Sequence, residues 1–210
     1  MRRISIGKER VGNIFKSFVE AELAVSGFTL TAPTVAERKS PGLRQGVYWF
    51  GNVEAYEPEQ GFFAASTFWS FTHELDDGPP MAQGGNDRLS GVYPEGVMET
   101  GSLDEDRIVT ALRRLVKSNL PLLNRFPDTV SLLSEAERYP GSAQYLLGLD
   151  ALASRFNLAH CLETNGLKAD AKEVYALIAS MGGRNPNRLV RAYLSAAERH
   201  VKALSEEASS

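Results

Sequence analysis

The chain has 210 residues, 43% of them hydrophobic and 23% charged, which is typical of a soluble globular protein with one sizeable domain or one domain and a helical appendage. It contains no apolar run of about eighteen residues, so the sequence predicts no membrane span, and its first residues show no signal-peptide pattern. A single cysteine excludes an internal disulfide framework, and we therefore expect a cytoplasmic protein.

The net charge of −3 is unevenly distributed along the chain. Residues 50–106 contain twelve Asp and Glu and one Arg, a charge of −11, whereas the segments before and after them each carry +4. A segment this acidic repels nucleic-acid phosphates and anionic lipids, and it attracts basic proteins. The sequence therefore predicts no binding to nucleic acid or membrane. It favours a basic protein partner, with solvated loops and a sheet edge as the alternative explanation of the charge.

The first predicted elements are a helix and a sheet. Apolar residues recur at spacings of three and four from Lys8 to Ser26, which predicts an amphipathic helix that Gly27 ends. A strand is predicted to begin near Phe28, and residues 37–46 are predicted to form a charged turn. Residues 47–56 and 62–72 alternate as strands do, so we expect them to pair as an antiparallel hairpin.

These two strands hold more aromatic residues than one face of a hairpin needs. Trp49 and Trp69 fall on the more apolar face, which we expect the helices to cover. Tyr48, Phe50 and Phe68 fall on the other face, among serine residues too polar for a core. That face is predicted to be partly exposed, and aromatic side chains there are favoured anchors for a partner.

Helices dominate the rest of the chain. A Ser102–Glu105 capping box precedes a helix over 104–119, which Pro121 is predicted to bend or end. Further helices are predicted after Asp128, after Ser142, from about residue 168 and from residue 187 to 204, with a disordered tail over 205–210.

Strands that precede helices favour an α+β fold rather than an alternating α/β fold. The prediction is an antiparallel sheet flanked by an N-terminal helix and a central helix, followed by a C-terminal α-helical subdomain. Residues 1–139 would form the α+β domain and residues 140–204 the helical subdomain packed on it.

The stretch "THELDDGPPMAQGGND", residues 72–87, gathers a histidine, four carboxylates and several turn residues. His73 and Glu74 begin a zincin-like motif, but Asp77 stands where the second histidine is required and the following Gly-Pro-Pro cannot continue a helix. Asp76, Asp77 and Asp87 lack the spacing of an EF-hand loop, although their oxygens suit a hard cation. We interpret the stretch as a loop on an acidic face, and we predict no metal site.

Other motifs favour structural explanations. The acidic residues 104–106 fall in the first turn of a helix, where the macrodipole stabilises carboxylates. His160 and Cys161 are neighbours on a helix and point in different directions, so they do not form a catalytic pair. The sequence has no glycine-rich phosphate loop and no G-x-S-x-G elbow. It therefore predicts no cofactor and favours a protein that is not an enzyme, although enzymes without such motifs exist.

The segment "FKSFVEAELAVSGF", residues 15–28, and the segment "DEDRIVTALRRLVKSNLPLLNRFPD", residues 104–128, resemble a family of uncharacterised bacterial proteins, over roughly residues 10–135. Its members open with a helix ending in Gly-Phe, continue into an antiparallel sheet and close with a helix and a proline-containing bend. Some of them are similar to immunity proteins of bacterial toxin systems. Four later residues resemble the packing positions of one tetratricopeptide-like unit: Leu158, Ala159, Ala171 and Tyr175.

The leading hypothesis is a non-enzymatic bacterial protein-binding module, which as an immunity protein would neutralise a basic toxin through an acidic surface bearing aromatic residues. The predicted partner-binding residues are Glu54, Glu57, Glu59, Phe68, Glu74, Asp76 and Asp77. Two alternatives stay open. One is a divalent-cation-dependent hydrolase that uses carboxylates of the acidic segment, and the other is a structural adaptor that uses the C-terminal helices.

Overall fold

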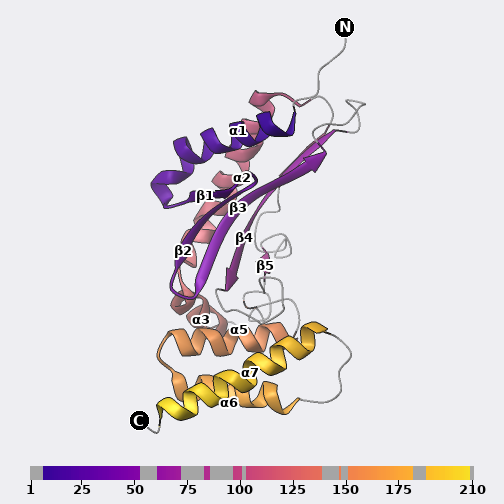
Figure 1. The fold of residues 1–210 in the computed structure, drawn as a ribbon. Helices are drawn as coiled ribbons and strands as arrows, with labels where there is room; N and C mark the ends of the chain where they lie inside the picture. The colour runs from indigo at the N-terminus through magenta and orange to yellow at the C-terminus, as the bar shows by residue number, and fades with distance from the viewer. Residues whose placement is uncertain are drawn as a thin grey trace. The chain divides into compact units, whose positions relative to one another are not determined.

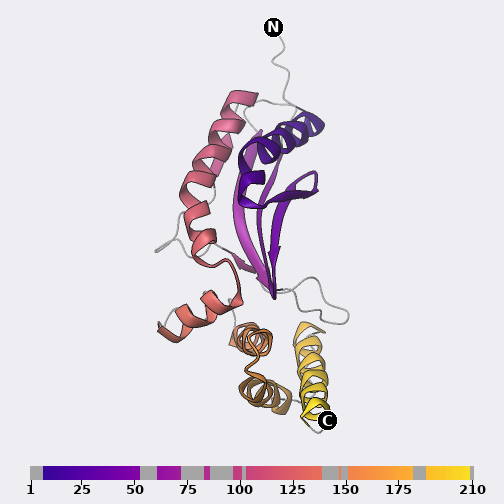
Figure 2. The same ribbon diagram turned by 90° about the vertical axis from the view of Figure 1, so that its left-hand side faces the viewer.

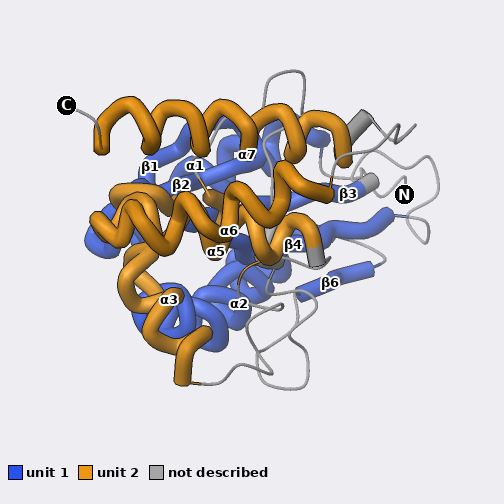
Figure 3. The backbone as a smooth tube through the Cα atoms, turned by 90° about the horizontal axis from the view of Figure 1, so that it is seen from below, with its two compact units in different colours: residues 1–39, 44–69, 85–125 blue, residues 40–43, 70–84, 126–210 orange. Residues whose placement is uncertain are grey.

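A computed structural model describes residues 7–52, 61–71, 83–85, 97–100, 103–138, 147, 151–181 and 188–208. Contacts within the chain divide it into two compact units, drawn in blue and orange in Figure 3. Unit 1 comprises residues 1–39, 44–69 and 85–125, and unit 2 comprises residues 40–43, 70–84 and 126–210. The domain boundary predicted near residue 139 lies outside the described residues and stays a prediction. By contacts, Arg125 belongs to unit 1 and Phe126 to unit 2.

The N-terminal helix of unit 1 spans the predicted residues in three geometries. Helix α1 (Lys8–Phe18) continues into a π-helical turn (Val19–Leu23) and a 3₁₀ turn (Ala24–Ser26). Gly27 then adopts φ 82°, a left-handed conformation that glycine takes without steric cost, and the helix ends there as predicted. The buried apolar residues of α1 are Val11, Ile14, Phe15 and Phe18.

The strands form one sheet (Figure 1). Its order is β1-β2-β3-β4-β5, and β6 also pairs with β4, in the antiparallel sense. The strand bounds are β1 (Thr29–Ala32), β2 (Val35–Ser40), β3 (Leu43–Asn52), β4 (Phe62–Phe71), β5 (Gln83–Gly85) and β6 (Val97–Thr100). An antiparallel sheet combined with helices confirms the predicted α+β fold.

The charged turn predicted over residues 37–46 is wrong, because β2 and β3 occupy most of it and only Pro41 and Gly42 form the turn. Gly42 has φ 75°, which favours glycine at a tight reversal. The charges misled the prediction because Arg38 is directed into the protein. Its Nε donates to Gln45 Oε1 at 2.7 Å and its Nη1 to the carbonyl of Ser26 at 3.2 Å.

Helix α2 (Glu105–Arg125) follows β6 in unit 1 and runs alongside the sheet in Figure 2. Asp104 caps it, since its Oδ1 accepts the backbone N–H of Arg107 at 2.9 Å, whereas the predicted cap Ser102 lies outside the described residues. Pro121 does not end the helix, which continues to Arg125 and buries Leu122 and Leu123. Proline removes one backbone donor, and burial of the following apolar turn offsets that loss.

Unit 2 is helical. Asp128 caps α3 (Thr129–Arg138) as predicted, accepting the N–H of Ser131 at 2.9 Å. Helix α5 (Ala151–Thr164) ends where Gly166 turns with φ 78°, again as predicted, and is followed by α6 (Lys168–Ser180) and α7 (Arg188–Glu207). Because α7 reaches Glu207, residues 205–207 are helical and not part of a disordered tail. Within the described part of the chain, no helix has the length and apolar character needed to cross a membrane.

Candidate functional site

The two faces of strands β3 and β4 differ in burial. On one face the large side chains are almost fully buried: Val47, Trp49, Phe63 and Trp69 are at most 2% exposed. This confirms the predicted direction of both tryptophans. Helices α1 and α2 pack on each other, and α2 packs on β6, so their apolar residues share the core of unit 1.

The opposite face carries a row of four aromatic side chains, Tyr48, Phe50, Phe62 and Phe68, which we call the aromatic row. Neighbouring ring centroids lie 5.9 Å apart for Phe68 and Tyr48, 6.0 Å for Tyr48 and Phe50, and 6.2 Å for Phe50 and Phe62. Phe50 is 51% exposed, and the other three side chains are half-buried. The row therefore joins two strands through ring contacts and presents one ring to solvent.

Met98 extends this surface on β6. In the β4–β6 register Ala64 lies opposite Met98, and Phe62 lies opposite Thr100. Residues directly opposite one another in an antiparallel pair share a face, so Met98 lies on the face of Phe62 and the aromatic row. Its side chain is 64% exposed. Phe50 and Met98 are thus the two most exposed apolar side chains on this face among the described residues.

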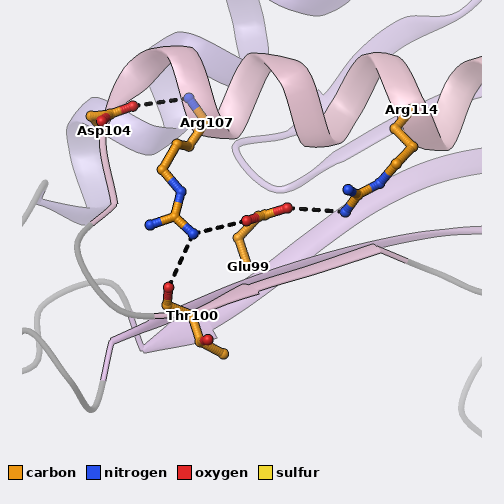
Figure 4. Close-up of polar contacts among 5 residues, drawn as sticks. All are labelled: Glu99, Thr100, Asp104, Arg107 and Arg114. Carbon is orange, nitrogen blue, oxygen red and sulfur yellow. Dashed lines mark hydrogen bonds and ion pairs between the residues drawn. The ribbon is translucent and has the colours of Figure 1, made fainter.

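An ion cluster on the other face holds β6 in place (Figure 4). Glu99 Oε2 pairs with Arg107 Nη2 and Glu99 Oε1 with Arg114 Nη2, each at 3.0 Å, and Arg107 also donates to the carbonyl of Thr100 at 3.2 Å. Both arginines belong to α2. Because successive residues of a strand point to opposite faces, anchoring Glu99 to α2 directs Met98 away from it.

Gly46 fixes the other end of the row. A Cβ atom at this position would lie 2.2 Å from the ring of Phe68 and 3.0 Å from the carbonyl oxygen of Ala36. The absence of a side chain at Gly46 therefore leaves room for the Phe68 ring against β3. Phe68 is half-buried, in agreement with the prediction that it is partly exposed.

The serines beside Phe68 do not behave as predicted. Ser66 and Ser70 are each 5% exposed, although we expected this face to be too polar for a core. A serine side chain is small, so its burial needs little covering surface. Exposure on this face is therefore concentrated at Phe50 and Met98.

Most of the predicted partner-binding residues cannot be placed. Glu54, Glu57, Glu59, Glu74, Asp76 and Asp77 lie outside the described residues, as do His73 and Asp87 of the turn-rich stretch. Phe68 is the one predicted residue that the structure describes. Met98 was missed by the sequence reasoning, because the short strand β6 has no long alternating pattern to reveal its face.

No family model, curated protein or solved structure matches the chain. The resemblance to bacterial immunity-like proteins and to a tetratricopeptide-like unit therefore stays a prediction. The function of the sheet face that carries the aromatic row and Met98, which we call the open face, is therefore inferred from its own residues.

Catalytic chemistry finds little support in the described part of the chain. No group of three or more His, Cys, Asp or Glu there is arranged to hold a metal ion. Cys161 is fully buried, and burial raises the pKa of its thiol to about 12, which leaves it protonated and inert at neutral pH. His160 is also buried, with Nε2 lying 3.3 Å from the carbonyl oxygen of Gly42. Both residues agree with the structural interpretation of the sequence.

A groove of about 330 Å³ lies between α1 and α2 in unit 1. Its walls are joined by two ion pairs, Arg10 with Glu105 at 3.6 Å and Arg113 with Glu22 at 2.8 Å. Each cation in the groove already has a carboxylate partner, and its apolar floor includes Ile14. Its lining also includes Ser17, but both carboxylates of the groove are paired with arginines, so the aromatic row and Met98 are the stronger candidate.

Proposed function

We propose that this chain is a protein-binding module that captures a basic protein partner with the open face of its sheet, through the aromatic row and Met98. The row of aromatic rings in mutual contact, with Phe50 exposed and opposite a buried apolar face, supports the proposal. Aromatic residues and methionine are enriched at the centre of protein interfaces, where they bury large apolar areas at little entropic cost.

The basic character of the partner is supported by charge. Phe50, Phe62, Phe68 and Met98 all belong to the segment 50–106, whose charge is −11. Opposite charge raises the rate of association and disfavours acidic competitors, whereas the apolar anchors supply most of the affinity. Neutralisation of a basic toxin, the function of immunity proteins, is the specific form that the sequence resemblance favours.

Affinity capture from the native host tests this function. The partner retained by the unmodified chain should be lost with Phe50→Ala, because truncating an anchor at the centre of an interface typically costs more than about 1 kcal/mol. Val25→Ala is the matched control, since Val25 is 87% exposed but belongs to the 3₁₀ turn and not to the open face. Equal capture by all three proteins would contradict the proposal.

Charge reversal tests the proposal that the partner is basic. Changing Glu74, Asp76 and Asp77 to Lys should slow association at low salt and leave a smaller difference at high salt, where screening weakens the attraction. Surface plasmon resonance with the captured partner measures both rates. An association rate independent of these changes and of salt would separate the acidic segment from binding.

A further inference from the structure

Strands β1 and β6, which each pair with a single strand in the described part of the chain, are strands of different kinds. Strand β1 is protected: the hydroxyls of Thr29 and Thr31 donate back to carbonyls of β2, and the β1–β2 register shifts between Leu30 and Ala32. Bulges and a following proline are devices by which proteins prevent an edge strand from pairing further. Pro33 follows β1 directly.

Strand β6 has none of these devices. Its sequence, Val-Met-Glu-Thr, contains no proline and no lysine, and its one charged side chain, Glu99, is held by α2. Its four residues pair in unbroken register with β4. In the described part of the chain β6 pairs with β4 alone, so its other edge has no strand beside it.

Hydrogen-bond alternation shows which backbone groups face that edge. The carbonyl of Thr100 accepts from Arg107 Nη2 at 3.2 Å, as expected of a carbonyl that points away from β4. In an antiparallel pair, every second residue directs both its N–H and its carbonyl away from its partner. Met98, two residues before Thr100, therefore directs its N–H and carbonyl to the same outer edge, while the groups of Val97 and Glu99 point toward β4.

We infer that the outer edge of β6 is the place where the partner adds a strand, so that an extended segment of the basic protein extends the sheet beside Met98. The inference rests on the proposed function and specifies how the partner is held. Backbone hydrogen bonds to Met98 supply affinity, and alternate side chains of the segment lie on the open face beside Met98. The carbonyl of Thr100 already accepts a hydrogen bond from the guanidinium of Arg107. The backbone N–H and carbonyl of Met98 are therefore the groups that would bond to the added strand.

Substitutions at position 98 distinguish the contribution of the backbone N–H to binding from that of the side chain. Met98→Pro removes an N–H that points away from β4, and proline is tolerated on an edge strand in that orientation. The sheet should therefore stay folded while strand addition is blocked. Met98→Leu keeps the N–H and a similar apolar side chain, and Val97→Pro removes an N–H that points toward β4 and should destabilise unit 1. Tryptophan fluorescence during denaturation checks folding, because both tryptophans, Trp49 and Trp69, lie in unit 1.

The probe is a synthetic peptide that alternates lysine and valine, compared with the same peptide carrying N-methyl groups at alternate residues. The unmodified chain and Met98→Leu should bind it, and Met98→Pro should bind it at least about tenfold more weakly, roughly 1.4 kcal/mol. The N-methylated peptide should not bind. Hydrogen exchange followed by NMR should show the Met98 amide protected when the peptide is added.

Failure to bind the plain peptide, equal binding by Met98→Pro, or an unprotected Met98 amide at saturating peptide would overturn the inference. Protection that depends on protein concentration alone would identify a second copy as the occupant, which also overturns it. If Phe50→Ala abolishes capture of the natural partner while Met98→Pro retains it, the proposed function stands and strand addition is wrong. If neither variant changes capture, the proposed function fails as well.

Discussion

The aromatic residues of the two units are used in different ways. In unit 2, Phe156, Tyr175 and Tyr193 are at most 1% exposed, and the ring of Phe156 lies 5.2 Å from each of the other two. In unit 1 the aromatic row is a line of rings from Phe68 to Phe62, and its member Phe50 is 51% exposed. A closed cluster stabilises a fold, whereas an open row leaves apolar area available to a partner.

The polar groups of the two units also differ in their surroundings. In unit 2 the carboxylate of Glu163 accepts from the Tyr175 hydroxyl and pairs with His200 Nδ1, each at 3.0 Å, and the imidazole stacks on the Tyr175 ring with centroids 4.5 Å apart. The carboxylate of Glu163 thus has two partners within this unit. In unit 1, Gln45 connects Arg38 to the carbonyl of Leu123 at 2.8 Å, and burial lowers the pKa of Arg38. Arg44, which shares a face of β3 with Tyr48, lies 3.9 Å from the carboxylate of Glu37, so unit 1 has polar contacts on both faces of its sheet.

The largest expected effect separates the two faces of β4. Trp69→Ala should lower the free energy of unfolding by about 3–5 kcal/mol, because it empties a fully buried site. Phe68→Ala should cost well under about 2 kcal/mol, since the ring is half-buried, and should weaken partner binding. Urea denaturation of the two variants measures both values. The reverse order would mean that the face of Phe68 is the core.

The next effect tests the contact between Gly46 and the aromatic row. Gly46→Ala should destabilise unit 1 by about 1–3 kcal/mol, because the new methyl group overlaps the Phe68 ring. Adding Phe68→Ala should recover part of that loss in a double-mutant cycle. Gly12→Ala is the control: its Cβ would meet only the carbonyl oxygen of Pro33 at 3.8 Å, and alanine favours a helix. Additive changes at positions 46 and 68 would disprove the contact.

The smallest effect depends on pH and belongs to unit 2. The hydrogen bond from His200, together with its charge and the Tyr175 hydroxyl, holds the pKa of Glu163 below its ordinary value of 4.5, against the opposing effect of burial. A carboxyl whose pKa is lowered by folding stabilises the fold above its unfolded pKa, and the stabilisation is lost as pH falls through the folded pKa. Stability should therefore decline on acidification below about pH 4.5, and less steeply in Glu163→Gln.

Circular dichroism during urea unfolding at neutral and acidic pH measures this decline. Glu207→Gln is the control, because Glu207 pairs with Lys168 at 2.6 Å on the surface, where ion pairs contribute about 0–1 kcal/mol. Identical pH profiles for the unmodified chain and Glu163→Gln would show that the buried-cluster interpretation of unit 2 is wrong.

The sequence alone determined the features that depend on neighbouring residues. The helix from Lys8 to Ser26, the stops at Gly27 and Gly166, the cap at Asp128 and the faces of Trp49 and Trp69 were all predictable. Each follows from a periodic apolar pattern or from the conformational preference of one residue, and both act over a few positions of the chain.

Tertiary structure decided the features that depend on distant partners. Arg38 lies in a strand and not in a charged turn because Gln45 and the carbonyl of Ser26 accept its guanidinium. Met98 faces outward because Glu99 is held by two arginines of α2. Charge and alternation in sequence do not reveal which side chain will find an opposite charge or a carbonyl after folding. The burial of a charged or polar residue therefore depends on contacts that only the packed chain provides.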